Sequence, residues 1–487
     1  MNVNLFMIGM IVYLIILVII GFVGAGKATD SEHYLVANRG LTLPVLVGTL
    51  IAGWLGAGTV VGHANISYSS GFGALWWVGG GTVAITIIIL ISKKLRRLNL
   101  YTVPDLLELR YGPLTKVLGS ITIIIAFTGI VGSQIKAMSY VLAAVTDIDP
   151  KTGAIIGALL VIFYTVMGGM YSVAYTDVLQ YAMLLVGLII AAPIAFSAAG
   201  GFSGWESNLS PTHFEATGGL GLSGALAIAL PFLMLATVDQ NLYQRMYSAK
   251  STGTARKGAI LGLIGGVTVM LLVFVIAVSS AVLFPGINPD LAVYIIATDL
   301  LNPFLGMILL IAILSIVMST ADSYLLSPAT NVSKDLYQRF IKKDASDKEI
   351  LIVTRVSVVV LGFIALAGAL WFDTFLGFML LGYTVYGSGV FFPILAAFVW
   401  KGATYKGAIA SILGGLTSTL IWEFTVNSTI PTIYIGAISS LSLLVIVSLL
   451  TEHSSSENVA PFFSKDEDVQ EELNEGPEIN MEERTIL

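Results

Sequence analysis

One short stretch of the chain concentrates hydroxyl and carboxyl groups among apolar residues. Within about one helical turn, the segment SIVMSTADSY contains Ser319, Thr320, Asp322 and Ser323. Oxygen atoms are the ligands that hard cations such as Na⁺ prefer, so this segment is a candidate cation site. The same hydroxyls would equally well bond the carbonyls of the preceding helical turn, and both interpretations stay open on this segment alone.

Four ionisable residues, Asp322 among them, fall inside apolar segments, where a charge is costly and a functional role is the first expectation. Asp322 is the deepest of them, and we expect it to be functional. Asp177 and Asp239 lie near segment ends, so solvated or loop-paired carboxylates are equally good interpretations. Lys136 lies about 13 Å by helical rise from the end of its segment, from where its side chain could extend toward the interface.

Composition identifies the membrane as the solvent of this protein. The chain is 56% hydrophobic and 11% charged, against roughly 25% charged residues in soluble domains. It has no cysteine, which excludes disulfides, thiol catalysis and thiolate metal sites. It also lacks a paired-histidine motif, a Walker loop and a nucleophile elbow. We therefore expect an integral membrane protein that is not an enzyme.

Apolar runs of about 20 residues, the length that crosses a bilayer, divide the chain into about thirteen predicted all-α spans. They lie near residues 4–25, 43–65, 74–92, 117–145, 152–169, 178–198, 221–242, 258–284, 303–327, 350–371, 374–399, 405–424 and 432–451.

The distribution of Lys and Arg predicts the orientation, because short cytoplasmic loops are enriched in both. With an outside N-terminus, Lys151 is the basic residue that lies outside, and Lys136 is the one that lies deep within a span. The cytoplasmic set is then Lys27, Arg39, Lys93–Arg97, Arg110, Lys116, Arg245, Lys250, Arg256, Lys257, Lys334–Lys348, Lys401 and Lys406. We expect a multi-pass protein of the cell membrane with its N-terminus outside and its C-terminus in the cytoplasm.

The spans group into two repeats. Residues 1–25 form an additional helix, 43–198 and 221–399 each form a five-helix unit, and 405–451 add two helices. Repeats with an odd number of helices must be inverted, as in many secondary transporters. The remaining residues, 452–487, hold eleven acids against Lys465 and Arg484, which is typical of a disordered cytoplasmic tail.

Inverted-repeat transporters bind solute and ions where the first helix of each repeat is broken. The first candidate break, GTLIAGWLGAGTVVG, surrounds Trp54 with glycines, and the second, LPFLMLATVDQN, contains Pro231 and Asp239. Glycines also allow close helix packing without any ligand, but interruptions in both repeats favour a binding site. The indole of Trp54 could stack on a solute or a cation, or fill the core.

At these residues the sequence resembles the sodium:solute symporter family, which has a LeuT-like fold, over roughly residues 30 to 400. The motifs are GGMYSVAYTDVLQ at 168–180, DQNLYQR at 239–245, and MSTADSY followed by KDLYQ at 318–337. WLGAGTVVG and DASDKEI are most similar to the choline-transporter branch. The resemblance implies a sodium-coupled symporter that imports a small organic solute by alternating access.

The resemblance also implies the binding residues. The co-transported sodium ion would be held by the carbonyls of Ala52, Leu55 and Ile316 and the hydroxyls of Ser319 and Thr320. Some relatives hold a second sodium, which here would involve Asp177, Ser319 and Ser323, with Asp322 beside them. The expected solute site comprises Trp54, Gly56, Thr59, Gln134, Lys136, Asp239, Tyr383 and Tyr386.

The solute is expected to be an amino acid, a carboxylate or a similar zwitterion. In the choline branch an aromatic box encloses a quaternary ammonium, but here Asp239 and Val83 replace aromatic residues and only Trp54 matches. Lys136 would also repel a cation at low dielectric constant. A choline or quaternary-amine transporter is the alternative, and a transporter-like solute sensor is an alternative of another class. We expect the solute and the bilayer to be its partners, without nucleic acid or an obligate protein partner.

Overall fold

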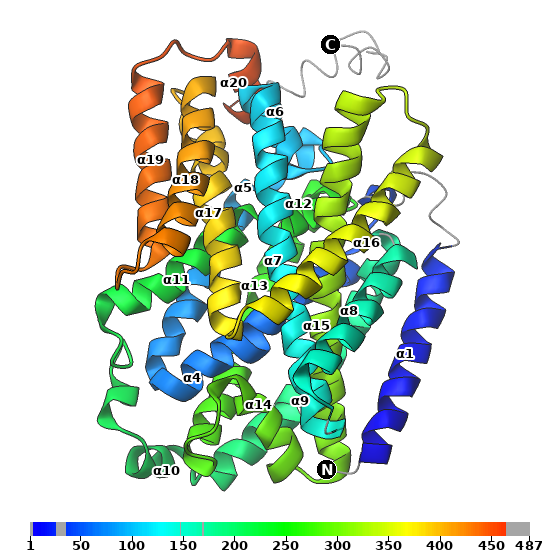
Figure 1. Cartoon of the computed structure of the whole chain (residues 1–487), viewed down its shortest axis with the longest axis vertical. Coiled ribbons are helices and arrows are strands. Elements are labelled where there is room, and N and C mark those ends of the chain that lie inside the picture. The colour runs from blue at the N-terminus through cyan, green and yellow to red at the C-terminus, as the bar shows by residue number, and fades with distance from the viewer. Residues whose placement is uncertain (1–2, 26–35, 147, 168–169, 464–487) are drawn as a thin grey trace.

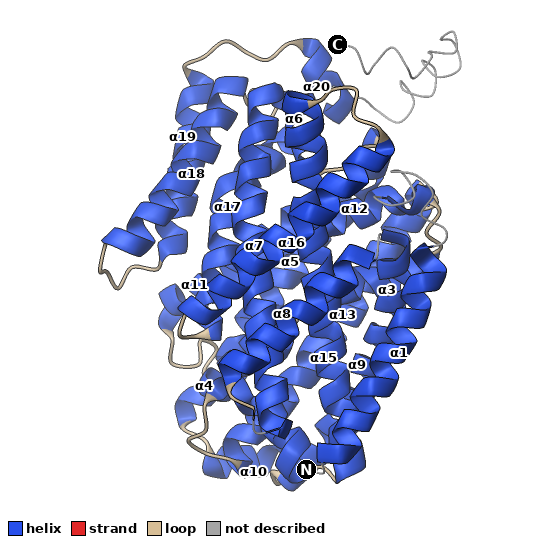
Figure 2. Ribbon diagram, turned by 45° about the vertical axis from the view of Figure 1, so that its right-hand side comes forward, coloured by secondary structure: helices blue, strands red, loops and turns tan. Residues whose placement is uncertain are grey.

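The computed structural model describes residues 3–25, 36–146, 148–167 and 170–463. Figures 1 and 2 show a bundle of helices within these ranges, in which the only β-type pairing is an isolated bridge between Leu41 and Ala249. The all-α prediction is therefore confirmed for the described part of the chain.

Within the described residues, each predicted span falls on one helix or on a run of consecutive helical segments. The long helices are α1 (Val3–Ala25), α5 (Leu75–Leu98), α7 (Pro113–Thr146), α8 (Pro150–Met167), α9 (Met170–Ala198), α11 (Gly221–Val238), α13 (Thr252–Leu283), α15 (Pro303–Thr330), α16 (Asp347–Trp371), α17 (Phe375–Val399), α18 (Tyr405–Thr425) and α19 (Thr432–Leu449). Among the described residues, eleven segments are long and apolar enough to cross a membrane, and Leu5–Leu17 and Leu43–Trp54 are shorter apolar helices. The protein is a multi-pass membrane protein, and the count of thirteen crossings stays a prediction.

Both predicted interruptions are present. The first is between α3 (Leu43–Trp54) and a π-helical turn, η2 (Gly58–His63), which continues into α4 (Ala64–Ser70). The second separates α11 from α12 (Gln240–Ser248) at Asp239, beyond the Pro231 that lies inside α11. Backbone groups freed at such breaks need partners, because the hydrocarbon core offers no water.

Two groups of helices pack around these interruptions. In the first group, α3 and α5 both contact α13, and α5 also contacts α11. In the second group, α7 contacts α8, α15, α16 and α17. Helix α17 also contacts α11, and α9 contacts both α3 and α15. The two broken helices therefore belong to one group and face α15 and α17.

Helices α6 (Val103–Tyr111) and α20 (Ser456–Phe463) lie at one end of the molecule (Figure 1). Basic side chains from several helices make their contacts at this end. Arg96 donates to the carbonyl of Ala249 at 2.6 Å, and Arg110 donates to that of Ala403 at 3.1 Å. Lys116 pairs with Asp105 at 2.7 Å. We call this end the basic face. Helix α1 begins near the opposite end, as an odd number of crossings requires (Figures 1 and 2).

The acidic tail is not disordered from its first residue. Ser456–Phe463 form α20, which packs against α6 and α17 and leaves Phe462 only 1% exposed. The adjacent Phe462 and Phe463 give this part of the tail apolar side chains that can pack on the bundle. The number of acidic residues in the tail did not indicate this packing. Residues 464–487, which hold most of the acids, lie outside the described residues.

The cysteine-free chain allows a direct test of the topology. Lys151 and Lys250 are both exposed and flank different ends of the bundle. In right-side-out vesicles, a membrane-impermeant maleimide should label a Lys151→Cys variant at once and a Lys250→Cys variant only after permeabilisation. Labelling of both variants from the same side would contradict the predicted orientation.

Candidate functional site: two helix breaks on α15

The first break packs directly on the hydroxyl segment of α15. The carbonyl of Ala52 accepts hydrogen bonds from Thr320 Oγ1 at 3.1 Å and from Ser319 Oγ at 3.4 Å. Thr320 Oγ1 also donates to the carbonyl of Ile316 at 3.0 Å. Leu55 follows the last residue of α3, and its N–H still bonds the carbonyl of Ile51 at 3.2 Å. Four of the five expected sodium ligands therefore converge, and Leu55 lies at the same break.

Glycine makes this approach possible. A Cβ atom at Gly56 would overlap the Thr320 side chain, and one at Gly53 would lie 2.9 Å from Cζ of Arg245. The hydrogen bond from Thr320 to the Ile316 carbonyl lies within α15, and a hydroxyl without any role in ion binding would also make it. The bonds to Ala52 are additional, because they join α15 to another helix whose ladder ends there.

A buried ion pair lies beside these hydroxyls. Arg245 and Asp177 are both fully buried, with Nη2 of the arginine 2.9 Å from Oδ2 of the carboxylate. Asp177 also accepts hydrogen bonds from Thr49 and Ser319. Because removing two charges from water is costly, such a pair is retained only where further hydrogen bonds satisfy both partners. Here α3 and α15 supply those bonds.

The positive-inside argument places Arg245 on the cytoplasmic side, but the structure shows this side chain fully buried in α12, so it is not a solvated loop charge. Its guanidinium donates to Thr49 Oγ1 at 2.8 Å, to Asn241 Oδ1 at 2.8 Å and to Ser323 Oγ at 2.9 Å. Ser323 Oγ in turn donates to Asp322 Oδ1 at 3.2 Å. The second oxygen of Asp322 has no partner within the described part of the chain. The residues expected at a second cation site therefore lie in one network with Arg245.

The first break also meets α7 and α17. Oε1 of Gln134 accepts the N–H of Ala57 at 2.8 Å, so the freed backbone donor is satisfied. A Cβ atom at Gly58 would overlap the hydroxyl of Tyr383. Gln134, Tyr383 and Gly56 thus share the neighbourhood of this break, as expected for a solute site, and Thr59 follows immediately in η2.

Several polar atoms around this break are buried without a partner in the described structure. Among them are Thr59 Oγ1, Trp77 Nε1 and Gln134 Nε2, and His63 Nδ1 at the end of η2 is another. An unmade buried hydrogen bond costs about 1–3 kcal/mol, so such atoms are candidates for contact with a bound solute, an ion or water. The indole and amide nitrogens are donors only. The set is therefore suited to an acceptor group such as a carboxylate.

Aromatic rings cover one side of the break. Trp54 stacks on Phe232 with centroids 5.6 Å apart, and Phe232 stacks on Trp77 at 4.4 Å. Tyr383 lies 6.0 Å from Trp77 and 6.1 Å from Phe232. The rings therefore face one another, whereas an aromatic cage turns its ring faces toward a bound cation.

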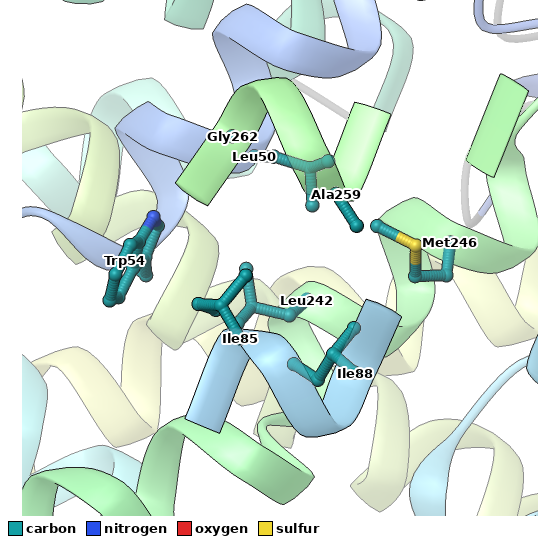
Figure 3. A pocket seen from close by; sticks show the side chains of 8 residues that line it. All are labelled: Leu50, Trp54, Ile85, Ile88, Leu242, Met246, Ala259 and Gly262. Atoms are coloured by element: carbon teal, nitrogen blue, oxygen red, sulfur yellow. The ribbon is translucent and has the colours of Figure 1, made fainter. Parts of the chain in front are cut away.

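Trp54 also borders a small cavity of about 10 Å³ (Figure 3). Its other lining residues are Leu50, Ile85, Ile88, Leu242, Met246, Ala259 and Gly262. A cavity of this size holds about one water molecule, and the lining is apolar apart from the indole N–H. It is a packing defect and not a solute site.

The second break is closed by tyrosines. Tyr386 donates to the carbonyl of Val238 at 2.7 Å, and Tyr243 donates to that of Thr237 at 3.0 Å. Asp239 caps α12 through the N–H of Asn241 at 2.7 Å and accepts a hydrogen bond from Tyr324. Asp239 and Tyr386 therefore meet at this break, as expected, and both make hydrogen bonds that fix its geometry.

Lys136 does not join the other candidate residues. Its ammonium donates to the carbonyl of Phe372, in the connection between α16 and α17. Asp290, in η5 (Pro289–Leu291), lies near this lysine and accepts hydrogen bonds from Asn65 at 2.8 Å and from Tyr140 at 3.3 Å. Burial raises the pKa of Asp290, and Asn65, Tyr140 and Lys136 partly offset this. Lys136 thus belongs to the face opposite the basic face.

The site contains residues that the sequence did not single out. Their shared property is that they are buried polar or aromatic groups with partners on other helices. They are Thr49, Trp77, Phe232, Asn241, Arg245 and Tyr324. The spacing of Asn241 and Arg245, four residues apart in DQNLYQR, was the available signal, because it places both on one face of a helix.

These features define a transporter with a LeuT-like inverted-repeat fold: two broken helices, a buried charge network and a many-helix bundle. The chain matches the model of the sodium:solute symporter family over residues 34–415. It therefore belongs to the sodium:solute symporter family, whose members are transporters and not enzymes.

Curated relatives agree with this assignment, and solved structures share the fold. The osmoregulated proline transporter OpuE of Bacillus subtilis is 28% identical over 91% of this chain and 94% of its own length. The human high affinity choline transporter 1 is 27% identical over 84% of this chain and 75% of its own length. An outward-open sodium-coupled sialic acid symporter gives a TM-score of 0.80 at 18% identity, covering 93% and 99% of the two chains. MhsT in complex with L-phenylalanine gives a TM-score of 0.58 at 15% identity, covering 83% and 97% of the two chains.

The close approach at Gly56 leads to a prediction. A Gly56→Ala variant should push the first break away from Thr320 and raise the sodium concentration for half-maximal uptake at least tenfold. A Gly79→Ala variant is the control, because nothing lies within 4 Å of a Cβ atom added there. Sodium titration of uptake in proteoliposomes measures both. Equal sodium dependence in the two variants would contradict the proposed contact.

Proposed function

We propose that this protein is a sodium-coupled symporter that imports a small solute bearing a carboxylate, such as an amino acid, across the cell membrane. The observation that carries the proposal is the convergence of the first helix break on the hydroxyls of α15. Broken helices of this kind offer carbonyls to a cation and a helix N-terminus to an anionic solute. By the positive-inside rule, the basic face is the cytoplasmic face.

The sodium ion is placed between α3 and α15. Its ligands are proposed to be the carbonyls of Ala52, Leu55 and Ile316 with the hydroxyls of Ser319 and Thr320. Bonds from both hydroxyls to the Ala52 carbonyl support this arrangement, because they hold the oxygens together before an ion arrives. A sodium ion there would join the moving break to α15, so sodium and solute would each tighten the binding of the other.

A second cation is proposed at Asp177, Ser323 and Asp322. Two ionised carboxylates and the Arg245 guanidinium would leave one negative charge in the network. The oxygen of Asp322 that lacks a partner in the described structure is the free ligand. A cation at this position would compensate the charge of an ionised Asp322.

The solute is proposed to lie against the first break. The unpaired donors of Trp77 and Gln134, together with Thr59 and the beginning of η2, favour a carboxylate. Trp54, Tyr383, Tyr386 and Asp239 would enclose the rest of the solute. Lys136 is omitted from this set because its ammonium is bonded to Phe372.

A quaternary amine is the second candidate solute. It is favoured by the aromatic cluster around Trp77 and by the similarity to a choline transporter. Because the rings cover one another's faces, this candidate requires them to separate. A thermal-shift screen of amino acids, carboxylates and quaternary amines, each with sodium or potassium, distinguishes the two classes.

Loss of either hydroxyl should weaken sodium coupling. Ser319→Ala and Thr320→Ala should each raise the sodium concentration for half-maximal uptake, because a lost ligand leaves the ion partly unsatisfied. The double variant should be non-additive, since the two groups share one ion. Thr330→Ala is the matched control, because among the described residues that hydroxyl bonds the carbonyl of Leu326 in its own helix. Unchanged sodium dependence in both single variants would refute the site.

Gln134→Glu tests the class of solute. The change keeps the oxygen that accepts the Ala57 N–H, removes the free amide donor and adds a negative charge. Uptake of a carboxylate solute should weaken by about 1–3 kcal/mol, the worth of a charge-assisted hydrogen bond, and binding of a quaternary amine should not weaken. Gln338→Glu adds the same charge in η7 (Asn331–Ile341) as a control. Unaltered affinity for the carboxylate solute in Gln134→Glu would exclude Gln134 from the site.

A further inference from the structure

Helix α20 is held on the basic face by its last two residues. Phe462 packs edge-on against Phe398 of α17 with centroids 5.4 Å apart, and its backbone carbonyl accepts a hydrogen bond from Lys94 of α5 at 3.0 Å. The Lys94 ammonium also lies 5.7 Å from the ring centre of Phe463, and that of Lys401 lies 5.4 Å from it. Lysines at the carboxyl end of a helix bond its free carbonyls and favour its dipole.

These contacts join helices that belong to different groups. Lys94 is on α5, which packs with α11 and α13, whereas α6 and α17 pack on α7. Figures 1 and 2 both show α20 beside α6 at the end of the bundle. Alternating access moves one group of helices against the other. Opening of the basic face would therefore have to move Lys94 on α5 away from α17. Helix α20 would then lose its contact with α5 or its contact with α17.

At the basic face, hydrogen bonds join α12 to α6 and α15 in this structure. Gln240 of α12 accepts the N–H of Val103 at 3.2 Å and donates to the carbonyl of Ser327 at 3.3 Å. Ser327 Oγ donates to Gln244 at 3.0 Å, and Ser327 is fully buried. These amide contacts hold α12 against α6 and α15, and α20 adds a separate connection between α5 and α17.

We propose that α20 is an autoinhibitory clamp, in which the chain's own C-terminal helix ties α5 to α17 and restrains opening of the basic face. The clamp depends on aromatic burial and on two lysines, and it needs no partner protein. The acidic segment that follows α20 is not required for it. Release of α20 would shift the equilibrium toward the state open at the basic face.

Thiol labelling of purified protein tests the clamp without a transported solute. A Ser327→Cys reporter is the single thiol in a chain that otherwise has no cysteine. Two truncations are compared in this background: one removes residues 456–487 and one removes only 464–487. A Lys250→Cys reporter, on an exposed residue, corrects for general reactivity. The readout is therefore independent of the proposed solute and of the proposed sodium ligands.

Removal of 456–487 should speed labelling of Ser327→Cys at least threefold, and removal of 464–487 should leave the rate unchanged. A Phe462→Ala, Phe463→Ala double variant of the full chain should reproduce the faster labelling, and its size-exclusion profile should show that it is folded. Wild-type labelling rates after removal of 456–487 would overturn the proposal. Equal acceleration by both truncations would overturn it as well, because the restraint would then reside in the acidic segment.

Discussion

The ion pair between Arg245 and Asp177 is the interaction on which the arrangement of this site depends. One guanidinium contacts Thr49 on α3, Asn241 on α12 and Ser323 on α15, and its carboxylate partner is on α9. In a low-dielectric core, loss of one partner of a buried pair costs about 3–5 kcal/mol. The pair therefore fixes where both broken helices lie relative to α15, and the hydroxyls of α15 can then meet the open end of α3.

The helix breaks turn this fixed arrangement into a binding site. A continuous helix would satisfy its own backbone groups, whereas the freed groups here bond side chains of other helices, as Ala57 does with Gln134 and Val238 with Tyr386. Small adjustments of a few side chains can then expose carbonyls to a cation and donors to a solute. Coupling of ion and solute follows if both bind the same movable segment.

The fold was predictable to a large extent because apolar length, glycine and proline are local properties of the sequence. Apolar runs of about 20 residues predicted the helices, and the glycines around Trp54 predicted the first break. The expectation that Ala52 and Thr320 lie close together came from the family resemblance. Arg245 was misplaced because its charge does not reveal whether partners on three other helices bury it. The mutual stacking of Trp77 with Phe232 and the docking of Phe462 are likewise long-range packing, which no local pattern encodes.

Hydrogen–deuterium exchange of the purified protein in sodium and in potassium tests the central claim most directly. An ion that joins the first break to α15 should slow exchange in residues 52–60 and residues 316–324 together, in sodium only, with the same sodium concentration dependence for both segments. Sodium-specific protection that is absent, or that is confined to one of the two segments, would contradict a shared ion.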